Sequence, residues 1–585
     1  MKYIVGMVGV SAGMVMNMGI AAVAWAEQPL SVVYPPDGHE TTAAQIFLIG
    51  TAPPAGEVTV NGQPIERSAA GHFAPSFPLQ LGENAFTLRY QDQELVLRVT
   101  RTDPNPTLPP GTGFAEGSLA PAVDLARLPN EPICFSAIAP AQATVSVSLS
   151  DQSIALLPQP SSVNLPPNSA VLTFSNQPAP SPTTTYQGCI AVASPGDLGV
   201  PEFQLTLNGS TIRQSGPSRV SVLAPAPAEV VEVTADSGTA RSGPSTDYSR
   251  LTPLPKGTQA SVTGREGEWL RLDYGGWIRA SETQAIPNAA LPRTLIRSIR
   301  ARTMGEWTEI AFPLQAPVPV TVQQGNRSFV LTLHNTTAQT DTIFLNDDPV
   351  IERLDWQQAA PSQVQYTFNL KSAQQWGYKL RYEGTTLILS LRHPPQVKSD
   401  SLAGIRILLD PGHGGPEDLG ARGPTGYPEK EVALIVSQLL RDRLEARGAT
   451  VIMTREGDID LYPQDRAALI NQAEPTLALS LHYNALPDDG DAVNTAGIGT
   501  FWYNAQSHSL AVFLHNYLVA SLDRPSYGVF WNNLALTRPT VAPAVLLELG
   551  FMINPDEFEW IINSAEQERL ADALADGIAA WLQQQ

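Results

Sequence analysis

The sequence predicts a multidomain protein in which several all-β modules precede a C-terminal α/β domain with a mostly parallel sheet. Up to about residue 396, short apolar runs alternate with polar residues and turns, a pattern typical of β-sandwiches and barrels. Turn-forming residues are frequent, with 51 prolines and 44 glycines in 585 residues. From residue 403 onward, strand-like runs alternate with amphipathic helices, which indicates βαβ units.

The overall charge restricts the classes of partner. The chain has 56 acidic and 36 basic residues, which gives a formal net charge of −20. Nucleic acids and anionic membranes favour patches of Lys and Arg. The composition therefore argues against both as main partners.

Residues 1–26 have the features of a secretory signal peptide. Met1 and Lys2 precede a long apolar run, and Ala24-Trp25-Ala26 provides a small-residue cleavage site. An uncleaved anchor is the alternative, because the apolar run is nearly long enough to span a bilayer. If the signal peptide is cleaved, we expect an exported protein, periplasmic or associated with the cell wall, that keeps no membrane span.

Export also permits a disulfide between the only two cysteines, Cys134 and Cys189. Both lie in strand-like segments of one β-rich region. Two buried thiols are the alternative. No His neighbours either cysteine, so a zinc site built on them is not expected.

Four modules are expected upstream of the α/β domain. Residues 27–102 resemble an immunoglobulin-like β-sandwich, and the proline-rich stretch 103–110 reads as a stiff linker. Residues 115–225 form a β-rich domain of unknown type. Residues 293–396 resemble the AMIN module that precedes cell-wall amidases, through their strand pairs and their position in the chain.

The fourth module, residues 228–284, resembles a bacterial SH3 domain. The resemblance rests on the turns at 241–245 and 256–258 and on Gly276-Trp277. Such modules commonly bind cell-wall peptide or glycan, and Trp269, Tyr274 and Trp277 could form a stacking surface for them. The alternative, that these aromatic residues form the core of the small barrel, is left open.

In the α/β domain, strands are expected at 404–410, 449–455, 476–484, 497–504 and 542–551, and helices at 429–447, 507–522 and 567–582. The first helix should be buried along one stripe. This stripe comprises Val432, Ile435, Val436, Leu439, Leu440 and Leu444.

Three side chains in this domain are candidate metal ligands. His413 follows the first strand in a glycine-rich turn, Glu429 opens the first helix, and His482 ends a later strand. A catalytic zinc site needs three protein ligands and an open position. Each residue also has an ordinary interpretation. His413 could be an exposed loop histidine, and Glu429 a first-turn acid favoured by the helix dipole. His482 could be a histidine at the sheet rim whose hydrogen bonds are satisfied.

Glu548 is harder to explain by packing alone. It lies within the apolar run 545–551, where an ionised carboxylate is costly to bury without a partner. Burial would raise its pKa towards that of a working general base.

These motifs, in this order, resemble the zinc-dependent N-acetylmuramoyl-L-alanine amidases of the amidase 3 family, over residues 404–585. The resemblance implies one zinc ion held by His413, Glu429 and His482, with Glu548 as the catalytic acid/base. It implies hydrolysis of the amide bond between N-acetylmuramic acid and L-alanine of peptidoglycan, in cell-wall remodelling or daughter-cell separation. The partners it implies are peptidoglycan and an activator or wall-associated protein.

The resemblance also suggests supporting residues. Asp410 and Asn484 would orient the histidines, although either could simply form a turn. Arg422 would meet carboxylates of the stem peptide, with a solvated loop charge as the alternative. Some family members carry an inhibitory helix after the second His ligand. The segment 483–496 is too short and polar for one, so restraint should come from the upstream domains or their partners.

Two other functions are compatible with the sequence. One is a zinc peptidase that cuts within the peptidoglycan stem. The other is a wall-binding scaffold with a degenerate catalytic domain, which the presence of all four expected catalytic residues argues against.

Overall fold

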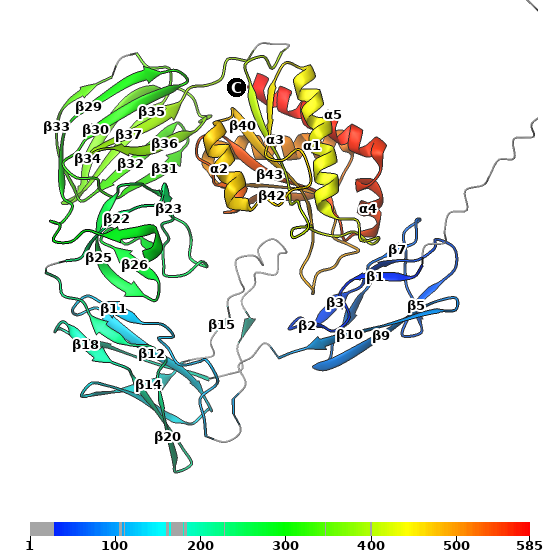
Figure 1. Ribbon diagram of the computed structural model, residues 1–585, viewed down its shortest axis with the longest axis horizontal. Coiled ribbons are helices and arrows are strands. Elements are labelled where there is room, and N and C mark those ends of the chain that lie inside the picture. The colour runs from blue at the N-terminus through cyan, green and yellow to red at the C-terminus, as the bar shows by residue number, and fades with distance from the viewer. Residues whose placement is uncertain are drawn as a thin grey trace, which may run out of the picture.

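The structure is a computed structural model, and it describes residues 29–103, 108–109, 112–159, 163–164, 179–180, 184–226, 228–345, 347–397 and 401–585. The expected signal peptide, 1–26, and most of the expected linker, 103–110, lie outside the described residues. The described parts form a ring in which the first β region (29–103) returns to contact the C-terminal domain (401–585) (Figure 1). None of the described helices is long and apolar enough to span a membrane.

The first β region is a two-layer arrangement of short strands. Its main sheets have the orders β1-β4-β7 and β2-β10-β9-β5-β6, and β3 pairs with β8. Alternate residues of the long strands point into a common core that includes Phe73, Leu88 and Val99. The strands are β1 (Ser31–Tyr34), β2 (His39–Thr41), β3 (Gln45–Phe47), β4 (Ile49–Thr51), β5 (Val58–Val60), β6 (Gln63–Pro64), β7 (His72–Phe73), β8 (Ser76–Pro78), β9 (Gly82–Tyr90) and β10 (Gln93–Arg101).

The second β region (112–226) contains both cysteines, for which the sequence left two states open. Cys134 and Cys189 face each other on paired strands and form a disulfide. The strands are β11 (Leu125–Arg127), β12 (Pro132–Ala139), β13 (Thr144–Leu149), β14 (Gln152–Pro158), β15 (Val163–Asn164), β16 (Ala179–Pro180), β17 (Thr184–Ala191), β18 (Gly196–Gly199), β19 (Glu202–Leu207), β20 (Ser210–Ser215) and β21 (Val220–Val222).

The third β region (228–286) continues the sheet of the second, because β11 pairs antiparallel with β25. Its core includes Val231, Leu254 and Ile278. The strands are β22 (Val230–Val233), β23 (Ser237–Gly238), β24 (Leu254–Pro255), β25 (Gln259–Glu266), β26 (Trp269–Leu272), β27 (Trp277–Arg279) and β28 (Thr283–Ala285).

The aromatic residues of this third region do not form an exposed stacking surface, so that interpretation is wrong. Trp269 and Trp277 are only 6% and 7% exposed. The guanidinium of Arg279 covers Trp269, and those of Arg127 and Arg271 cover Trp277. Tyr274 packs against the barrel core with its hydroxyl buried.

The fourth β region (292–397) is a sandwich of two sheets, ordered β33-β29-β30-β37-β36 and β31-β32-β35-β34. Large side chains from both sheets, including Phe312, Tyr366 and Leu389, share one core. The strands are β29 (Thr294–Met304), β30 (Trp307–Pro313), β31 (Val320–Gly325), β32 (Ser328–His334), β33 (Thr336–Phe344), β34 (Ile351–Ala360), β35 (Gln363–Leu370), β36 (Tyr378–Glu383) and β37 (Thr386–Arg392).

The C-terminal domain is built on a mixed six-stranded sheet of order β39-β38-β40-β43-β41-β42. β41 runs antiparallel to β43, whereas the other neighbours in this sheet pair in parallel. The strands are β38 (Arg406–Pro411), β39 (Thr450–Met453), β40 (Leu477–Asn484), β41 (Ile498–Trp502), β42 (Ser526–Trp531) and β43 (Ala544–Phe551). The helices are α1 (Glu429–Ala446), α2 (Pro463–Ala473), α3 (His508–Leu522), α4 (Pro555–Ile561) and α5 (Ser564–Gln583).

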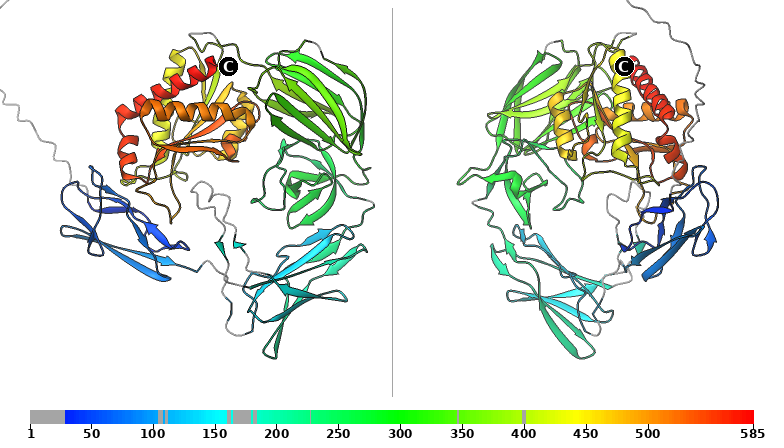
Figure 2. Two further views of the ribbon diagram at one scale, coloured as in Figure 1. Left: turned by 180° about the vertical axis from the view of Figure 1, so that it is seen from behind. Right: turned by 45° about the vertical axis from the view of Figure 1, so that its right-hand side comes forward.

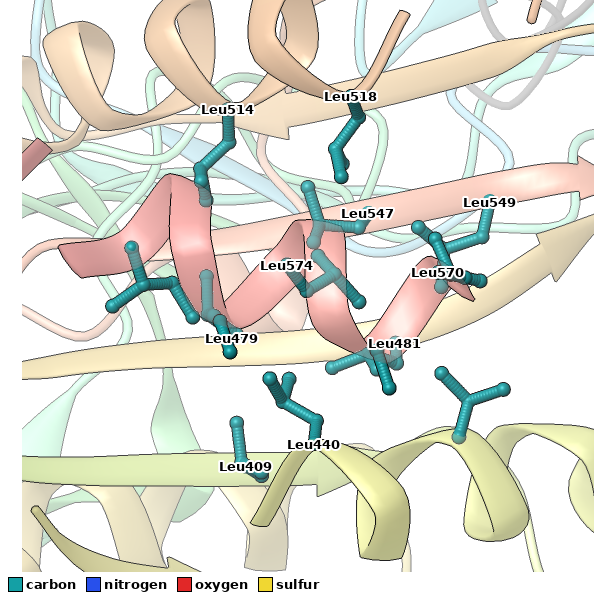
Figure 3. Packing of buried hydrophobic residues seen from close by; sticks show 14 of the residues in the cluster. Leu409, Leu440, Leu479, Leu481, Leu514, Leu518, Leu547, Leu549, Leu570 and Leu574 are labelled. Carbon is teal, nitrogen blue, oxygen red and sulfur yellow. The ribbon is translucent and has the colours of Figure 1, made fainter. Parts of the chain in front are cut away.

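Both faces of this sheet are buried, which explains the nearly continuous apolar runs of its central strands. Along β38, Ile407 and Leu409 face the core formed with α1, α3 and α5, whereas Leu408 faces the core that contains Ile470 of α2. Figure 3 shows leucines from the strands and helices interdigitating in the first of these cores. One residue of the expected helix stripe is placed wrongly, because Ile435 is 37% exposed.

Candidate active site

The candidate site lies where the carboxyl ends of adjacent parallel strands meet. β38, β40 and β43 are neighbours in the sheet and run in the same direction. His413 follows the end of β38, and His482 in β40 lies directly opposite Glu548 in β43. Residues far apart in the sequence therefore meet at one edge, where ligands bind in open α/β sheets. Glu429, the first residue of α1, completes the group.

His413, Glu429 and His482 are close enough to share one metal ion. One ligand atom from each lies within 4.8 Å of the others. His413 Nε2 is 3.1 Å from Glu429 Oε2, and His482 Nδ1 is 3.0 Å from Glu429 Oε1. Two imidazoles and one carboxylate match the donors that zinc takes in hydrolytic sites. The sequence-predicted ligand set is thus brought together.

Glycines allow this close approach. A Cβ on Gly412 would lie 2.4 Å from Cε1 of His482, and one on Gly420 would lie 2.5 Å from Oε2 of Glu429. Any side chain at Gly412 would displace the imidazole. The glycine-rich sequence around His413 therefore leaves space for the neighbouring ligands.

The Glu429 carboxylate is buried and ionised. Burial raises its pKa, but hydrogen bonds and charge from His413 and His482 outweigh burial and hold the pKa far below its usual range. Its oxygens also accept hydrogen bonds from the backbone N–H groups of Tyr483 and Ala421, at 2.9 and 2.8 Å. These bonds fix both oxygens in place, so the carboxylate is positioned before any ligand binds.

His413 is held from its other side by Asp418. The Asp418 carboxylate lies 2.6 Å from Nδ1 and leaves Nε2 facing Glu429. Burial lowers the pKa of His413, but Glu429 and Asp418 outweigh burial and raise it to about 9. A carboxylate behind a ligating histidine fixes the orientation of the ring. The sequence analysis missed Asp418.

Glu548 is half-buried, and its Oε2 is buried without a hydrogen-bond partner in the described part of the chain. Burial and the negative charge of Glu429 raise its pKa well above its usual range. Unpartnered buried polar atoms are rare and frequently mark catalytic groups. Glu548 thus has a buried carboxyl group with a perturbed pKa beside the cluster of His413, Glu429 and His482.

Neither Asp410 nor Asn484 is hydrogen-bonded to a candidate ligand histidine in the described part of the chain. Asp410 is fully buried and accepts hydrogen bonds from Thr454 Oγ1 (2.5 Å), Arg466 Nη1 (2.8 Å) and Ser480 Oγ (2.5 Å), not from a ligand histidine. Its carboxylate therefore joins the strands beneath the site. Asn484 Oδ1 accepts from the N–H of Ala485, because the strand ends there and its side chain turns back on the backbone.

Two buried arginines support the loop that carries His413. Arg466 Nη2 donates to the carbonyl of His413 at 2.7 Å, and Arg455 Nη2 donates to that of Gly412 at 2.8 Å. Arg455 is only 2% exposed, so it does not face substrate as a free charge. Arg422, expected to meet substrate, is exposed in the loop before α1. Its role in binding remains a prediction.

The first β region packs against the rim of the site. Phe47 and Ile49 share a buried apolar cluster with Phe551 and Ile553, which follow Glu548 in the chain. His72 stacks edge-on against Phe558 of α4, with ring centroids 5.3 Å apart. The loop after His482, expected to lack an inhibitory helix, has no helix in the structure.

The polar centre of this contact is Asp488 in that loop. Its carboxylate is hydrogen-bonded to the hydroxyl of Tyr34 and, at 2.9 Å, to Nε2 of His39. Burial raises the pKa of Asp488, but hydrogen bonds from Thr41, Tyr34 and His39 outweigh burial and lower it below 3.8. The first β region therefore stabilises the rim loop in one position.

Replacing Asp488 by Asn should make the backbone amides of residues 485–497 exchange with solvent about tenfold faster, because charge-assisted hydrogen bonds that hold this loop are lost. Because the folded-state pKa of Asp488 is lowered, its contribution to the stability of this contact is present above pH 3.8. The contribution is lost as the pH falls through the folded-state pKa. Hydrogen exchange with mass spectrometry measures the effect. The neighbouring exposed Asp489→Asn is the matched control, and equal exchange in both variants would contradict the prediction.

A cluster of two histidines and a glutamate beside an unpartnered carboxylate, at the rim of an α/β sheet, is typical of metal-dependent hydrolases. Comparison with known proteins identifies the family. Residues 407–580 match the N-acetylmuramoyl-L-alanine amidase family, and residues 236–284 match the bacterial SH3 domain family. The germination-specific N-acetylmuramoyl-L-alanine amidase of Bacillus subtilis (strain 168) is 33% identical over 202 residues, 31% of this chain and 81% of that protein. The chain belongs to the N-acetylmuramoyl-L-alanine amidase family.

Other similar proteins also match the C-terminal part of this chain. The probable cell wall amidase LytH of Staphylococcus aureus is 33% identical over 186 residues, 32% of this chain and 60% of that protein, so this chain spans less than two thirds of it. Among solved structures, an N-acetylmuramoyl-L-alanine amidase from Clostridium difficile 630 is 30% identical over 31% of this chain and 98% of its own, with a TM-score of 0.30. The prediction of an amidase of peptidoglycan with an upstream bacterial SH3 domain is confirmed by the family matches.

Proposed function

We propose that the C-terminal domain hydrolyses the amide bond between N-acetylmuramic acid and L-alanine of peptidoglycan with the aid of one zinc ion. One observation carries the proposal: His413, Glu429 and His482 form a compact cluster beside Glu548 in a domain of the amidase family. The upstream β regions, of immunoglobulin-like, bacterial SH3 and AMIN-like character, would hold this exported enzyme at the cell wall.

The residues fit a zinc ion by their chemistry. His413 and His482 offer ring nitrogens, Glu429 offers a carboxylate oxygen, and the buried Oε2 of Glu548 has no partner in the described residues. Zinc bound to such a set supplies Lewis acidity, which polarises an amide carbonyl and eases deprotonation of water. Soft thiolate ligands are not available here, since Cys134 and Cys189 are bridged.

The protein groups divide the remaining work. Glu548, with its raised pKa, accepts a proton from the attacking water and passes it to the amine nitrogen as the C–N bond breaks. Water oxygen ends in the new carboxylate of the sugar, and the proton ends on the L-alanine amine. Asp418 and the carbonyl contacts of Arg466 keep His413 oriented throughout.

Product analysis on purified peptidoglycan tests the proposal. The full chain should release stem peptides with a free L-alanine amino group, and activity should disappear with a chelator and return with added zinc. Mass spectrometry of the products and metal analysis of the protein give the two readouts. Internal cleavage of the stem would favour a peptidase, and bound zinc without any cleavage would favour a scaffold.

A further inference from the structure

A cavity outside the candidate active site lies where the third and fourth β regions meet the C-terminal domain. It has a volume of about 530 Å³, within the usual range for small-molecule sites. Hydrogen bonds between the regions hold its walls together: Thr252 accepts from the N–H of Val322 at 2.8 Å, and Gln324 Nε2 donates to Gln506 at 3.0 Å. The cavity is therefore part of the packing between these regions, whose ribbons lie side by side in both views of Figure 2.

This cavity carries positive charge without matching acids. Arg250 and Arg538 line it, and neither forms an ion pair within 4.0 Å in the described part of the chain. The pKa of Arg538 is lowered to about 10, mainly by burial and in addition by the positive charges of Arg250 and Arg241. Glu282 attracts Arg250, but its carboxylate accepts a hydrogen bond from the N–H of Thr239. Arg538 donates hydrogen bonds to Asn533, which is uncharged. In a chain of net charge −20, two neighbouring arginines without an ion-pair partner indicate a site for an anion.

An aromatic platform lies beside these arginines. Trp531 and Tyr503 are stacked, with ring centroids 5.4 Å apart and planes 25° apart. Trp531 is 61% exposed, and its indole N–H donates to the carbonyl of Tyr503 at 3.0 Å, which fixes the ring. An oriented, exposed indole provides a flat apolar face of the kind on which the C–H face of a sugar ring packs.

The rest of the lining is uncharged and combines apolar side chains, such as Leu251 and Trp502, with amides from Gln323, Gln324 and Asn504. The cavity is separate from the catalytic centre. Gly499 of β41 lies opposite Glu548, and the antiparallel strand then runs away from it towards Trp502 at the other end of the sheet. A ligand here would not compete with the scissile bond.

We propose that this cavity binds a sugar that bears a free carboxylate, namely a muramic acid residue already freed of its peptide. The ring packs on Trp531 and the carboxylate is bound between Arg250 and Arg538. The inference rests on the proposed function, because each amide hydrolysis converts the sugar's lactyl amide into such a carboxylate. The enzyme then retains the glycan strand that it has processed.

Calorimetric titration of the full chain with N-acetylmuramic acid, and with N-acetylglucosamine, which lacks the lactyl carboxylate, tests this inference. Loss of the carboxylate should weaken binding about tenfold or more, as expected for charge-assisted hydrogen bonds. Arg538→Gln should remove that preference, and Trp531→Ala should weaken binding of both sugars. Trp356→Ala, at an exposed tryptophan of β34 that does not line the cavity, is the matched control and should bind normally.

Equal binding of the two sugars, unchanged binding in Arg538→Gln and Trp531→Ala, or inorganic phosphate binding more tightly than N-acetylmuramic acid would overturn the inference. The Glu548→Ala chain separates this failure from failure of the proposed function. The Glu548→Ala chain should keep sugar binding while losing cleavage. If the unaltered chain cleaves peptidoglycan but does not bind the sugar, only the proposed sugar site is refuted.

Discussion

Replacing Glu548 by Gln should lower the rate of peptidoglycan cleavage by about a hundredfold to ten-thousandfold, the usual contribution of a general acid or base. Gln keeps the shape of the side chain but neither accepts the proton of water nor returns it to the amine. Metal content should be unchanged, since Glu548 Oε2 lies beside the cluster without belonging to it.

The measurement is the rate of stem-peptide release by the full chain, with metal content determined on the same samples. Glu456→Gln, at a side chain 76% exposed, is the control and should leave the rate unchanged. A Glu548→Gln chain that binds metal and retains more than about a tenth of the activity would show that another group moves the proton.

Replacing Arg466 by Met should lower the free energy of unfolding of the strands beneath the site by about 3–5 kcal/mol, because it leaves the Asp410 carboxylate buried without its charged partner. Arg466 and Asp410 are 3% and 0% exposed. Burial raises the pKa of Asp410, but Arg466 and the hydroxyls of Ser480 and Thr454 lower it below the usual range. The same change removes the bond from Arg466 to the His413 carbonyl, so activity should fall as well.

Hydrogen exchange of peptides covering β38 measures this loss locally, which suits a protein of several domains. Arg441→Met, at a surface ion pair with Asp442, is the control and should cost less than about 1 kcal/mol. Unchanged protection of β38 in Arg466→Met would contradict the prediction. It would mean that the hydroxyls of Ser480 and Thr454 alone compensate the buried charge of Asp410.

The contact between the first β region and the loop after His482 connects the upstream part of the chain to the candidate site. The segment 483–496 was expected to lack an inhibitory helix, and restraint was expected from the upstream domains. In the structure, the same segment is bound by Tyr34 and His39 of the first β region. Whatever moves that region also acts on the loop that follows His482.

Local sequence signals singled out the four central residues as candidates, and the family resemblance supplied their expected roles. Apolar runs define β38, β40 and β43, and parallel strands bring the residues at their carboxyl ends to one edge. Glu548 is conspicuous because an acid inside an apolar run is costly. The weaker elements α2, β42 and α4 were missed, since α2 buries only Arg466 and Ile470 and gives little apolar periodicity.

The sequence by itself thus determined that strand-rich regions precede an α/β domain, and it determined the candidate ligands of that domain, because these depend on short-range patterns. Only the tertiary structure decided the supporting contacts. Asp418 rather than Asp410 orients His413, Arg127 from another region covers Trp277, and three regions together build the cavity with Arg250 and Arg538. The contacts of Arg127 and of the cavity join residues far apart in the sequence. Asp418 lies only five positions from His413, but such polar side chains have no periodic pattern that would single them out.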